Sequence, residues 1–472
     1  MKFTKLSLAA LAAITVVSSA SAVENVKVDG QLKLWYQTAQ TSAPGGSNLF
    51  EKGTVGSTNG GSIGDFVANV GVAGDLTKNV GFGMRMYAVT TMGLENNLVS
   101  GEAINNTATN GVLNGQEKNP YWLGEAYFTY KAGNTIAKLG RQELPEGLSP
   151  LAYSETWNAA PNTFEAAAFI NNDIPNTTVA VAYVGKGDGE SNTLAGPNLK
   201  TINAGAAFAN YQDLKTNAGA VLGAGGAVSG GALAIIAVNN SITNLTIHPA
   251  YYSVNNVANA FWLDAAYNVP SIAKIEAQYA DVKADGFLDR TLKVLGATDT
   301  TTDAYAVRVS GDVYGVKLGA SYSSVDKGVL PVGNTATNFA TTPIYTAGVG
   351  GTMTGMLAGA PDTTGYKIDM NTKLYGIDLG AYYNSFEMKS NNGGGGIGGY
   401  YQVGALGIPQ MLGTLPAGVT TLKPSSSAIT AGAKVDQVNL LAAYVAENNI
   451  GYDATGNKLN QKVVRVVASI NF

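Results

Sequence analysis

The chain has 472 residues, a formal net charge of −4, 59 glycines, only 13% charged residues and no cysteine. So few and such scattered charges argue against nucleic-acid binding, and the lack of cysteine excludes disulfides and thiolate metal sites. A mean hydropathy of +0.05 is too low for a bundle of membrane-spanning helices, because each such helix needs about 20 apolar residues in a row.

The N-terminus has the pattern of a secretory signal peptide. Two lysines precede an apolar run over residues 6–17, and residues 20–22 (Ala-Ser-Ala) form a small-residue cleavage site. The apolar run is too short to cross a bilayer as a helix. We therefore expect residues 1–22 to be removed and residues 23–472 to form one domain.

The rest of the chain reads as a series of β-hairpins. After the turn at Tyr314-Gly315, apolar residues alternate strictly with polar ones, which predicts strands with one apolar and one polar face. The same order of branched residue, Leu, Ala and Tyr recurs after Tyr375 and after Asp436. In chain order we expect a strand over residues 27–37, hairpins over residues 65–89, 121–142, 163–184, 232–254, 260–282 and 304–324, hairpins turning at 375–376 and 436–437, and a last strand over residues 462–472.

This pattern gives about eighteen strands, with sixteen or twenty as open alternatives, and predicts an all-β fold, a transmembrane antiparallel β-barrel. The count stays open because residues 185–231 could hold another hairpin and residues 425–434 are weakly patterned. Outward-facing Leu and Ala suit lipid, and Tyr at one height on successive strands suggests an aromatic girdle. Short joints alternate with long ones, as in outer-membrane barrels.

The loop over residues 143–162 is more apolar than an exposed loop should be, since it contains Leu144, Leu148, Leu151, Tyr153 and Trp157. We expect this third outer loop to fold into the barrel and pack against its inner wall. The alternative is that it packs against neighbouring outer loops. Folding inward would bring three loop carboxylates, Glu143, Glu146 and Glu155, toward the lumen.

Strand alternation directs several basic side chains into the lumen: Arg85, Arg308, Lys317, Lys367 and Arg465. Lys138 and Arg141 are three residues apart on one strand, so their side chains point to opposite faces and one of them must face away from the lumen. Loop carboxylates across a narrow pore from these cations would create a transverse field. The simpler alternative is that any water-filled lumen carries scattered charges.

Several motifs resemble those of a known family. The signal peptide, the Gly140-Arg141-Gln142 strand end, the loop that follows and the stretch Pro161–Glu165 resemble eighteen-stranded bacterial porins, especially campylobacter-type major outer membrane porins, and more distantly the substrate-specific channels of pseudomonads. This resemblance implies a homotrimer, passive diffusion and a constriction made by the third loop against basic wall residues. On this resemblance, Arg141 and the loop carboxylates correspond to residues of that constriction. A full arginine ladder cannot be matched, so no carboxylate specificity is implied.

The final strand alternates toward a terminal aromatic residue, Phe472, which resembles the signal read by the outer-membrane barrel assembly machinery. We thus expect a porin integral to the Gram-negative outer membrane, surrounded by its lipid and passing ions and small hydrophilic solutes. No cofactor, metal or nucleic acid is expected. The residues expected at the pore constriction are Arg85, Arg141, Glu143, Glu146, Glu155, Glu165, Arg308, Lys317 and Arg465.

Two other classes of function were weighed. A surface structural or adhesive protein would act through its long outer loops. An outer-membrane hydrolase would use Ser62 of a Gly-x-Ser-x-Gly sequence with the only histidine, His248. The hydrolase is disfavoured because the Ser62 motif lies in a glycine-rich loop with no following helix, so we do not expect an enzyme.

Overall fold

Twenty strands and two short helices make up the part of the chain that the computed structural model describes. That part comprises residues 23–46, 48–51, 60–94, 99, 121–187, 212–213, 231–254, 257–294, 297–334, 341–389, 419–453 and 455–472. The expected signal peptide, residues 1–22, lies outside it. None of the helices within these ranges is long and apolar enough to cross a bilayer.

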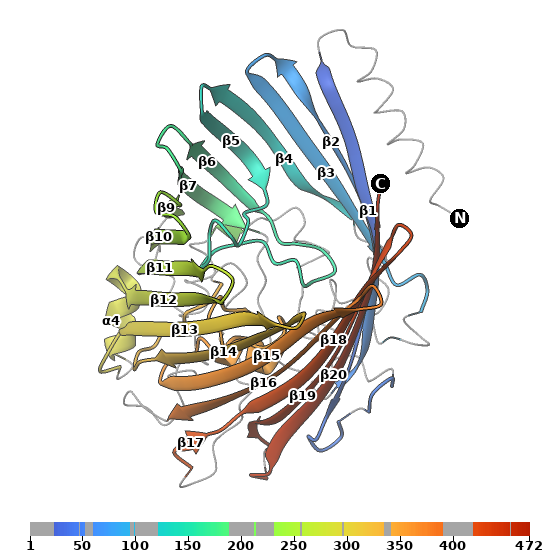
Figure 1. The fold of residues 1–472 in the computed structure, drawn as a ribbon, viewed down its shortest axis with the longest axis vertical. Coiled ribbons are helices and arrows are strands. Elements are labelled where there is room, and N and C mark those ends of the chain that lie inside the picture. The colour runs from blue at the N-terminus through green and yellow to red at the C-terminus, as the bar shows by residue number, and fades with distance from the viewer. Residues whose placement is uncertain are drawn as a thin grey trace.

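The strands form a single antiparallel sheet that curves into a ring (Figure 1). They are β1 (Glu24–Thr41), β2 (Gly60–Thr77), β3 (Val80–Thr90), β4 (Tyr121–Ala132), β5 (Thr135–Gln142), β6 (Phe164–Asn171), β7 (Thr177–Gly187), β8 (Gln212–Asp213), β9 (Ala232–Asn239), β10 (Leu245–Val254), β11 (Ala258–Val269), β12 (Ala273–Ala284), β13 (Thr301–Val313), β14 (Val316–Val325), β15 (Thr363–Leu374), β16 (Ile377–Lys389), β17 (Thr421–Leu422), β18 (Ser425–Val435), β19 (Val438–Tyr452) and β20 (Lys458–Asn471). The helices are α4 (Gly286–Val294) and α5 (Met353–Leu357).

The ring closes where the first strand meets the last. β1 pairs with β2 on one side and with β20 on the other, where Gln31 lies opposite Asn471 and Thr41 opposite Gln461. β8 and β17 are two residues long and only extend the pairing of β7 and β16. The barrel proper therefore has eighteen strands, which confirms the expected fold and count. Within the described part of residues 185–231, the structure adds no hairpin beyond the short β8.

Tight turns join the strands at one end of the barrel, where the sequence predicted them. Tyr314 and Gly315 have positive φ angles of 53° and 83°, and Tyr375 and Gly376 have φ angles of 49° and 84°. Two successive positive φ angles are typical of the type I′ hairpin turn, whose twist matches that of the strands it joins. The long connections lie at the opposite end.

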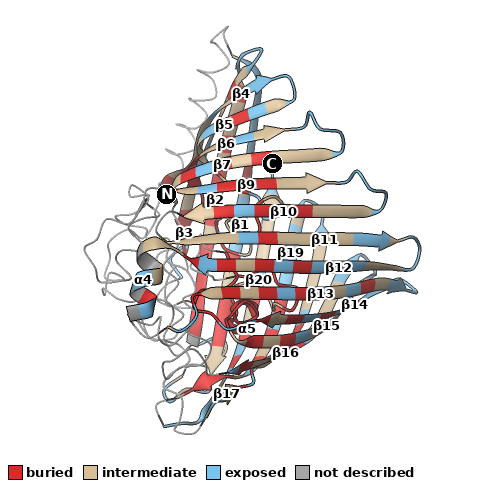
Figure 2. Cartoon of the chain, turned by 90° about the vertical axis from the view of Figure 1, so that its left-hand side faces the viewer, coloured by how far each residue is buried: buried red, intermediate tan, exposed pale blue. Residues whose placement is uncertain are grey.

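The barrel wall has an apolar outer face and a polar inner face. On β13, Tyr305, Val307 and Val309 point outward and are 52%, 49% and 51% exposed, while the alternate residues point inward. This alternation can be followed along β10–β14 in Figure 2. Outward tyrosines stand side by side on neighbouring strands, with ring centroids 6.3 Å apart for Tyr305 and Tyr322, as an aromatic girdle requires.

Two loops fold into the barrel and fill part of its interior. The third loop, residues 143–163, follows β5 and runs through the middle of the ring in Figure 1, which confirms the predicted infolding. The seventh loop, residues 326–362, follows β14 and includes α5, all of whose residues are buried. We expected only the third loop to fold inward, and the infolding of the seventh was not predicted.

Replacing outward-facing Val307 by Lys places a charge in hydrocarbon near the middle of β13. We expect the free energy of unfolding in lipid vesicles to fall by about 2–4 kcal/mol. Asn439→Lys is the matched control, because Asn439 is exposed on the inner face of β19, and its effect should stay within about 1 kcal/mol. Equal losses for both variants would contradict the assignment of the faces.

Candidate pore constriction

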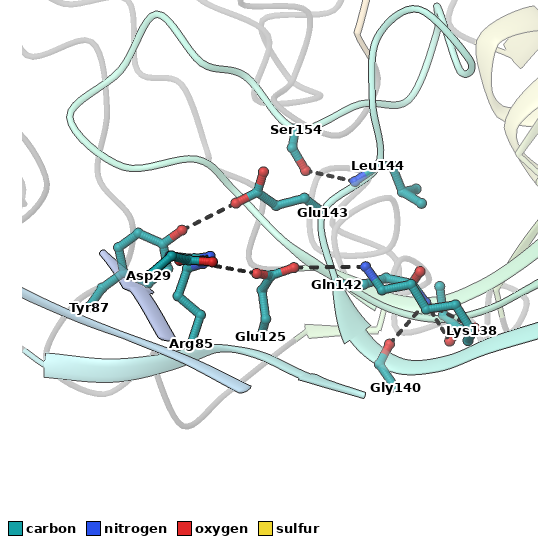
Figure 3. Close-up of polar contacts among 11 residues, drawn as sticks. Asp29, Arg85, Tyr87, Glu125, Lys138, Gly140, Gln142, Glu143, Leu144 and Ser154 are labelled. Carbon is teal, nitrogen blue, oxygen red and sulfur yellow. Dashed lines mark hydrogen bonds and ion pairs between the residues drawn. The ribbon is translucent and has the colours of Figure 1, made fainter. Parts of the chain in front are cut away.

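The third loop crosses the lumen and is bonded to walls on different sides of it. Near its start, the Glu143 carboxylate accepts a hydrogen bond of 3.2 Å from the Tyr87 hydroxyl on β3 (Figure 3). Near its middle, the carbonyl oxygen of Leu148 lies 3.1 Å from Nε2 of His248 on β10. Near its end, inward side chains of β1 donate to its backbone carbonyls. A loop held at these three places must pass through the barrel.

Apolar burial and local hydrogen bonds explain why this loop folds inward. Leu144, Leu151 and Tyr153 are buried against the wall and the seventh loop. Removing such side chains from water contributes about 25 cal/mol per Å² of apolar surface. Ser154 closes the loop on itself, since its hydroxyl oxygen accepts from Leu144 N at 3.0 Å and its own N donates to Leu144 O at 2.8 Å.

The seventh loop covers the other side of the lumen. Gln278 on β12 donates to the Pro343 carbonyl at 2.9 Å, and Thr354 N donates to Glu447 on β19 at 2.7 Å. The loop therefore reaches along the wall from β12 to β19. Its apolar stretches, residues 329–332 and 353–357, carry the same signal that identified the third loop, so sequence reasoning could have found it.

Glu155 joins the two loops. Its carboxylate accepts hydrogen bonds from Trp157 Nε1 at 2.6 Å, Asn334 Nδ2 at 3.1 Å and Thr341 Oγ1 at 2.5 Å. The residue is 1% exposed. Our expectation that Glu155 presents its charge to the pore is wrong, because the side chain is enclosed between the loops and acts as their common acceptor.

Arg465 is also buried instead of lining water. Its guanidinium lies between the rings of Trp35 and Trp157, at 5.5 and 4.9 Å from their centroids, where cation–π attraction holds it. It donates to Gln37 on β1 and, at 2.9 Å, to the Gly350 carbonyl of the seventh loop. The inward direction was predicted correctly, but Arg465 anchors both loops to the wall and is not a pore-lining cation.

Arg85 and Arg308 face the lumen, but each has carboxylate partners on its own wall. The predicted transverse field between loop carboxylates and wall cations is therefore replaced by local ion pairs on the wall. Such pairs alternate in sign over a few ångströms, so their field fades rapidly in water. The partners are Asp29 (2.5 Å) and Glu125 (3.1 Å) for Arg85, and Asp369 (2.7 Å) and Glu276 (3.5 Å) for Arg308.

Glu143 and Glu146 are the loop carboxylates that remain beside the lumen. Burial raises the pKa of Glu143 above its ordinary value, and the neighbouring Glu125 raises it further. Burial likewise raises the pKa of Glu146, with a smaller contribution from Glu155. As pH falls, these two groups will lose their charge earlier than ordinary glutamates, and the lumen will become more positive.

Arg141 and Glu165 lie on the outer face of the barrel, which removes both from the expected constriction. Arg141 pairs in register with Ala126 and Glu165, two residues from outward-facing Leu139 on the same strand. Its guanidinium binds the Glu165 carboxylate at 2.8 Å. Of the two residues with conflicting parity, Lys138 is the one that faces the lumen, opposite inward Thr129.

Lys317 is exposed on the inner face but lies far from the two loops. It is the second residue of β14, next to the Tyr314-Gly315 turn, and pairs in register with Asp312. Its position is at the short-turn mouth of the barrel, so it lies outside the part of the lumen that the loops narrow.

The structure does not assemble the residues of a hydrolase. Ser62 on β2 bonds Tyr36 and the Thr38 hydroxyl, whereas His248 on β10 bonds Asp264 at 3.1 Å and the third loop. His248 is therefore a wall residue. Among the described residues, no group of three or more His, Asp or Glu side chains is arranged to hold a metal ion.

Together these features define a transmembrane β-barrel whose lumen is narrowed by two infolded loops. The fold is similar to that of several solved structures. OccK8 (OprE) of Pseudomonas aeruginosa is 12% identical with a TM-score of 0.63, over 96% of this chain and 99% of that one. OccAB2 of Acinetobacter baumannii is 14% identical with a TM-score of 0.61, over 96% and 100%. No protein-family model and no curated protein matches the sequence.

The role of Glu155 can be tested by replacing it with Ala. The change leaves three donors without their buried acceptor, so the two loops should separate and single-channel conductance should rise and fluctuate more. Unfolding should become easier by about 2–4 kcal/mol. Glu146→Ala, which removes another carboxylate from the same loop, is the control. Unchanged conductance in Glu155→Ala would show that the loops hold together without it.

Lys138 and Arg141 provide a second, matched test, because they are three residues apart but face opposite sides. Lys138→Gln should raise the cation-to-anion permeability ratio by about twofold, since it leaves Glu125 less compensated. Arg141→Gln should leave the reversal potential in a salt gradient unchanged. The reverse result would place Arg141 in the pore and Lys138 outside it.

Proposed function

We propose that this protein is a porin of the Gram-negative outer membrane, which passes ions and small hydrophilic solutes along their gradients. One observation carries the proposal: inside a barrel with an apolar outer face, charged side chains below the loops stay accessible to water. The side chain of Asp29 is 62% exposed and that of Lys274 is 39% exposed. A barrel of this size is too wide for side chains to fill.

The fold shared with OccK8 and OccAB2 supports the proposal. We also propose the finer points that the sequence suggests: removal of residues 1–22, a homotrimer surrounded by lipid, and assembly through the C-terminal Phe472. Phe472 is 62% exposed, and its backbone pairs with Gly30 on β1, so its ring is available at the seam of the barrel. Kinship with campylobacter-type porins rests on the sequence motifs alone.

Purified protein in a planar bilayer should give large, stepwise, ohmic currents, and liposomes containing it should swell in small sugars but not in large oligosaccharides. Heat-denatured protein is the control. A barrel that inserts and yet conducts nothing would overturn the proposal. If such a barrel bound envelope or host partners through its loops, the adhesive function would replace the porin proposal.

A further inference from the structure

Each of the two luminal arginines is the centre of a row of four charged side chains. In each row an Asp, an Arg, a Glu and a Lys follow one another, and each contacts the next. Figure 3 shows the first row beneath the third loop. The rows are Asp29–Arg85–Glu125–Lys138, with contacts of 2.5, 3.1 and 3.9 Å, and Asp369–Arg308–Glu276–Lys274, with contacts of 2.7, 3.5 and 2.5 Å.

In both rows the arginine reaches its Asp across an intervening strand, and a glycine makes room for it. Arg85 on β3 passes over Gly71 of β2, where an added Cβ would lie 2.7 Å from its guanidinium. Arg308 on β13 passes over Gly319 of β14, where an added Cβ would meet both Arg308 and Asp369 within about 2.5 Å. Such close approaches are not accidental surface pairs, so both rows are built features of the wall.

A polar residue on the same intervening strand completes each row. Arg85 Nη1 donates to Asn69 Oδ1 at 2.7 Å, and Arg308 Nη1 donates to Ser321 Oγ at 3.2 Å. Each guanidinium thus has its donors engaged on three sides. A carboxylate on a passing solute would have to displace one of these partners before it could bind the arginine.

The rows lie at the same height on opposite walls. Arg85 is five residues from Val80, where β3 begins at a short turn, and Arg308 is five residues from Val313, where β13 ends at one. β3 and β13 are nine strands apart in the ring of eighteen. A solute that has passed the two loops must therefore travel between the rows.

Each row has two positive and two negative charges, so neither attracts simple ions of one sign. The end that is more accessible to water is Asp29 in the first row and Lys274 in the second. Two other inward lysines, Lys33 and Lys367, place their ammonium groups at the loops, where they donate to backbone carbonyls at 3.2 and 2.7 Å. Neighbouring opposite charges match a solute that carries both signs.

We propose that the two rows make the pore selective for small zwitterionic solutes, which carry one ammonium and one carboxylate, over uncharged or singly charged solutes of similar size. The inference rests on the proposed function. The field of each row is short-ranged, so a zwitterion gains when it passes close to a row, where its ammonium group is drawn to Asp29 or its carboxylate to Lys274. A singly charged solute gains at one row end and loses at the other.

The test compares entry of glutamine, a zwitterion, with that of arabinose, an uncharged solute of similar size, into liposomes containing the protein. Glutamine should enter about threefold faster, as one screened charge contact predicts. The reversal potential in a KCl gradient should lie near zero. Arabinose entry and KCl conductance also test the proposed function, so their absence would refute the porin itself.

Three variants then separate selectivity for zwitterions from selectivity for ions. Asp29→Asn should shift the reversal potential toward anions and Lys274→Gln toward cations, since each leaves its row with one net charge. The quadruple variant Asp29→Asn, Lys138→Gln, Lys274→Gln, Asp369→Asn leaves one neutral Arg–Glu pair in each row. Its potential should stay near zero, yet its glutamine-to-arabinose ratio should fall to about one. The double variant Arg141→Gln, Glu165→Gln removes an ion pair from the outer face and should behave like the wild type.

Two results would overturn the inference while leaving the porin in place. One is a wild-type protein that passes arabinose and KCl but admits glutamine no faster than arabinose. The other is a quadruple variant that keeps the glutamine advantage. Circular dichroism of each variant in detergent should show the β spectrum of the wild type, which confirms that the barrel has formed.

Discussion

Closure of the sheet between β1 and β20 is the constraint on which the rest of the structure depends. In hydrocarbon, a backbone N–H or C=O group without a partner costs several kcal/mol, so a lipid-exposed sheet cannot have an open edge. The register from Gln31–Asn471 to Thr41–Gln461 removes that edge. Once the ring is closed with eighteen strands, its interior is too wide for wall side chains alone to fill.

The interior is therefore organised by loops, and those loops are held by polar as well as apolar contacts. Glu155 accepts hydrogen bonds from both loops, and Arg465 ties both to the wall between two tryptophan rings. Buried charges are tolerated only when their hydrogen-bonding groups are satisfied. Glu155 and Arg465, which the sequence pattern placed at the pore constriction, instead hold in place the loops that narrow the lumen.

Charged side chains on the water-exposed part of the wall are also paired with groups of opposite charge. Arg85 and Arg308 are each flanked by two carboxylates, one on the adjacent strand and one two strands away, which the arginine reaches over a glycine of the strand between. The lumen is thereby neutral in short stretches instead of being positive on one side and negative on the other. On the proposal above, such rows favour zwitterions, whose two opposite charges cancel overall.

The amino-acid sequence by itself determined the barrel, the positions of its turns and the inward or outward direction of most side chains. Alternation with a period of two and positive-φ turn residues such as Tyr314-Gly315 are local properties, and apolar residues in the third loop revealed its infolding. What only the tertiary structure decided is which charges meet. The pairing of Arg85 with Asp29, 56 residues away, the burial of Glu155 and the outward direction of Arg141 depend on register, on a bulge between Arg85 and Met86 opposite β4 and on contacts between distant loops, and no local pattern encodes these.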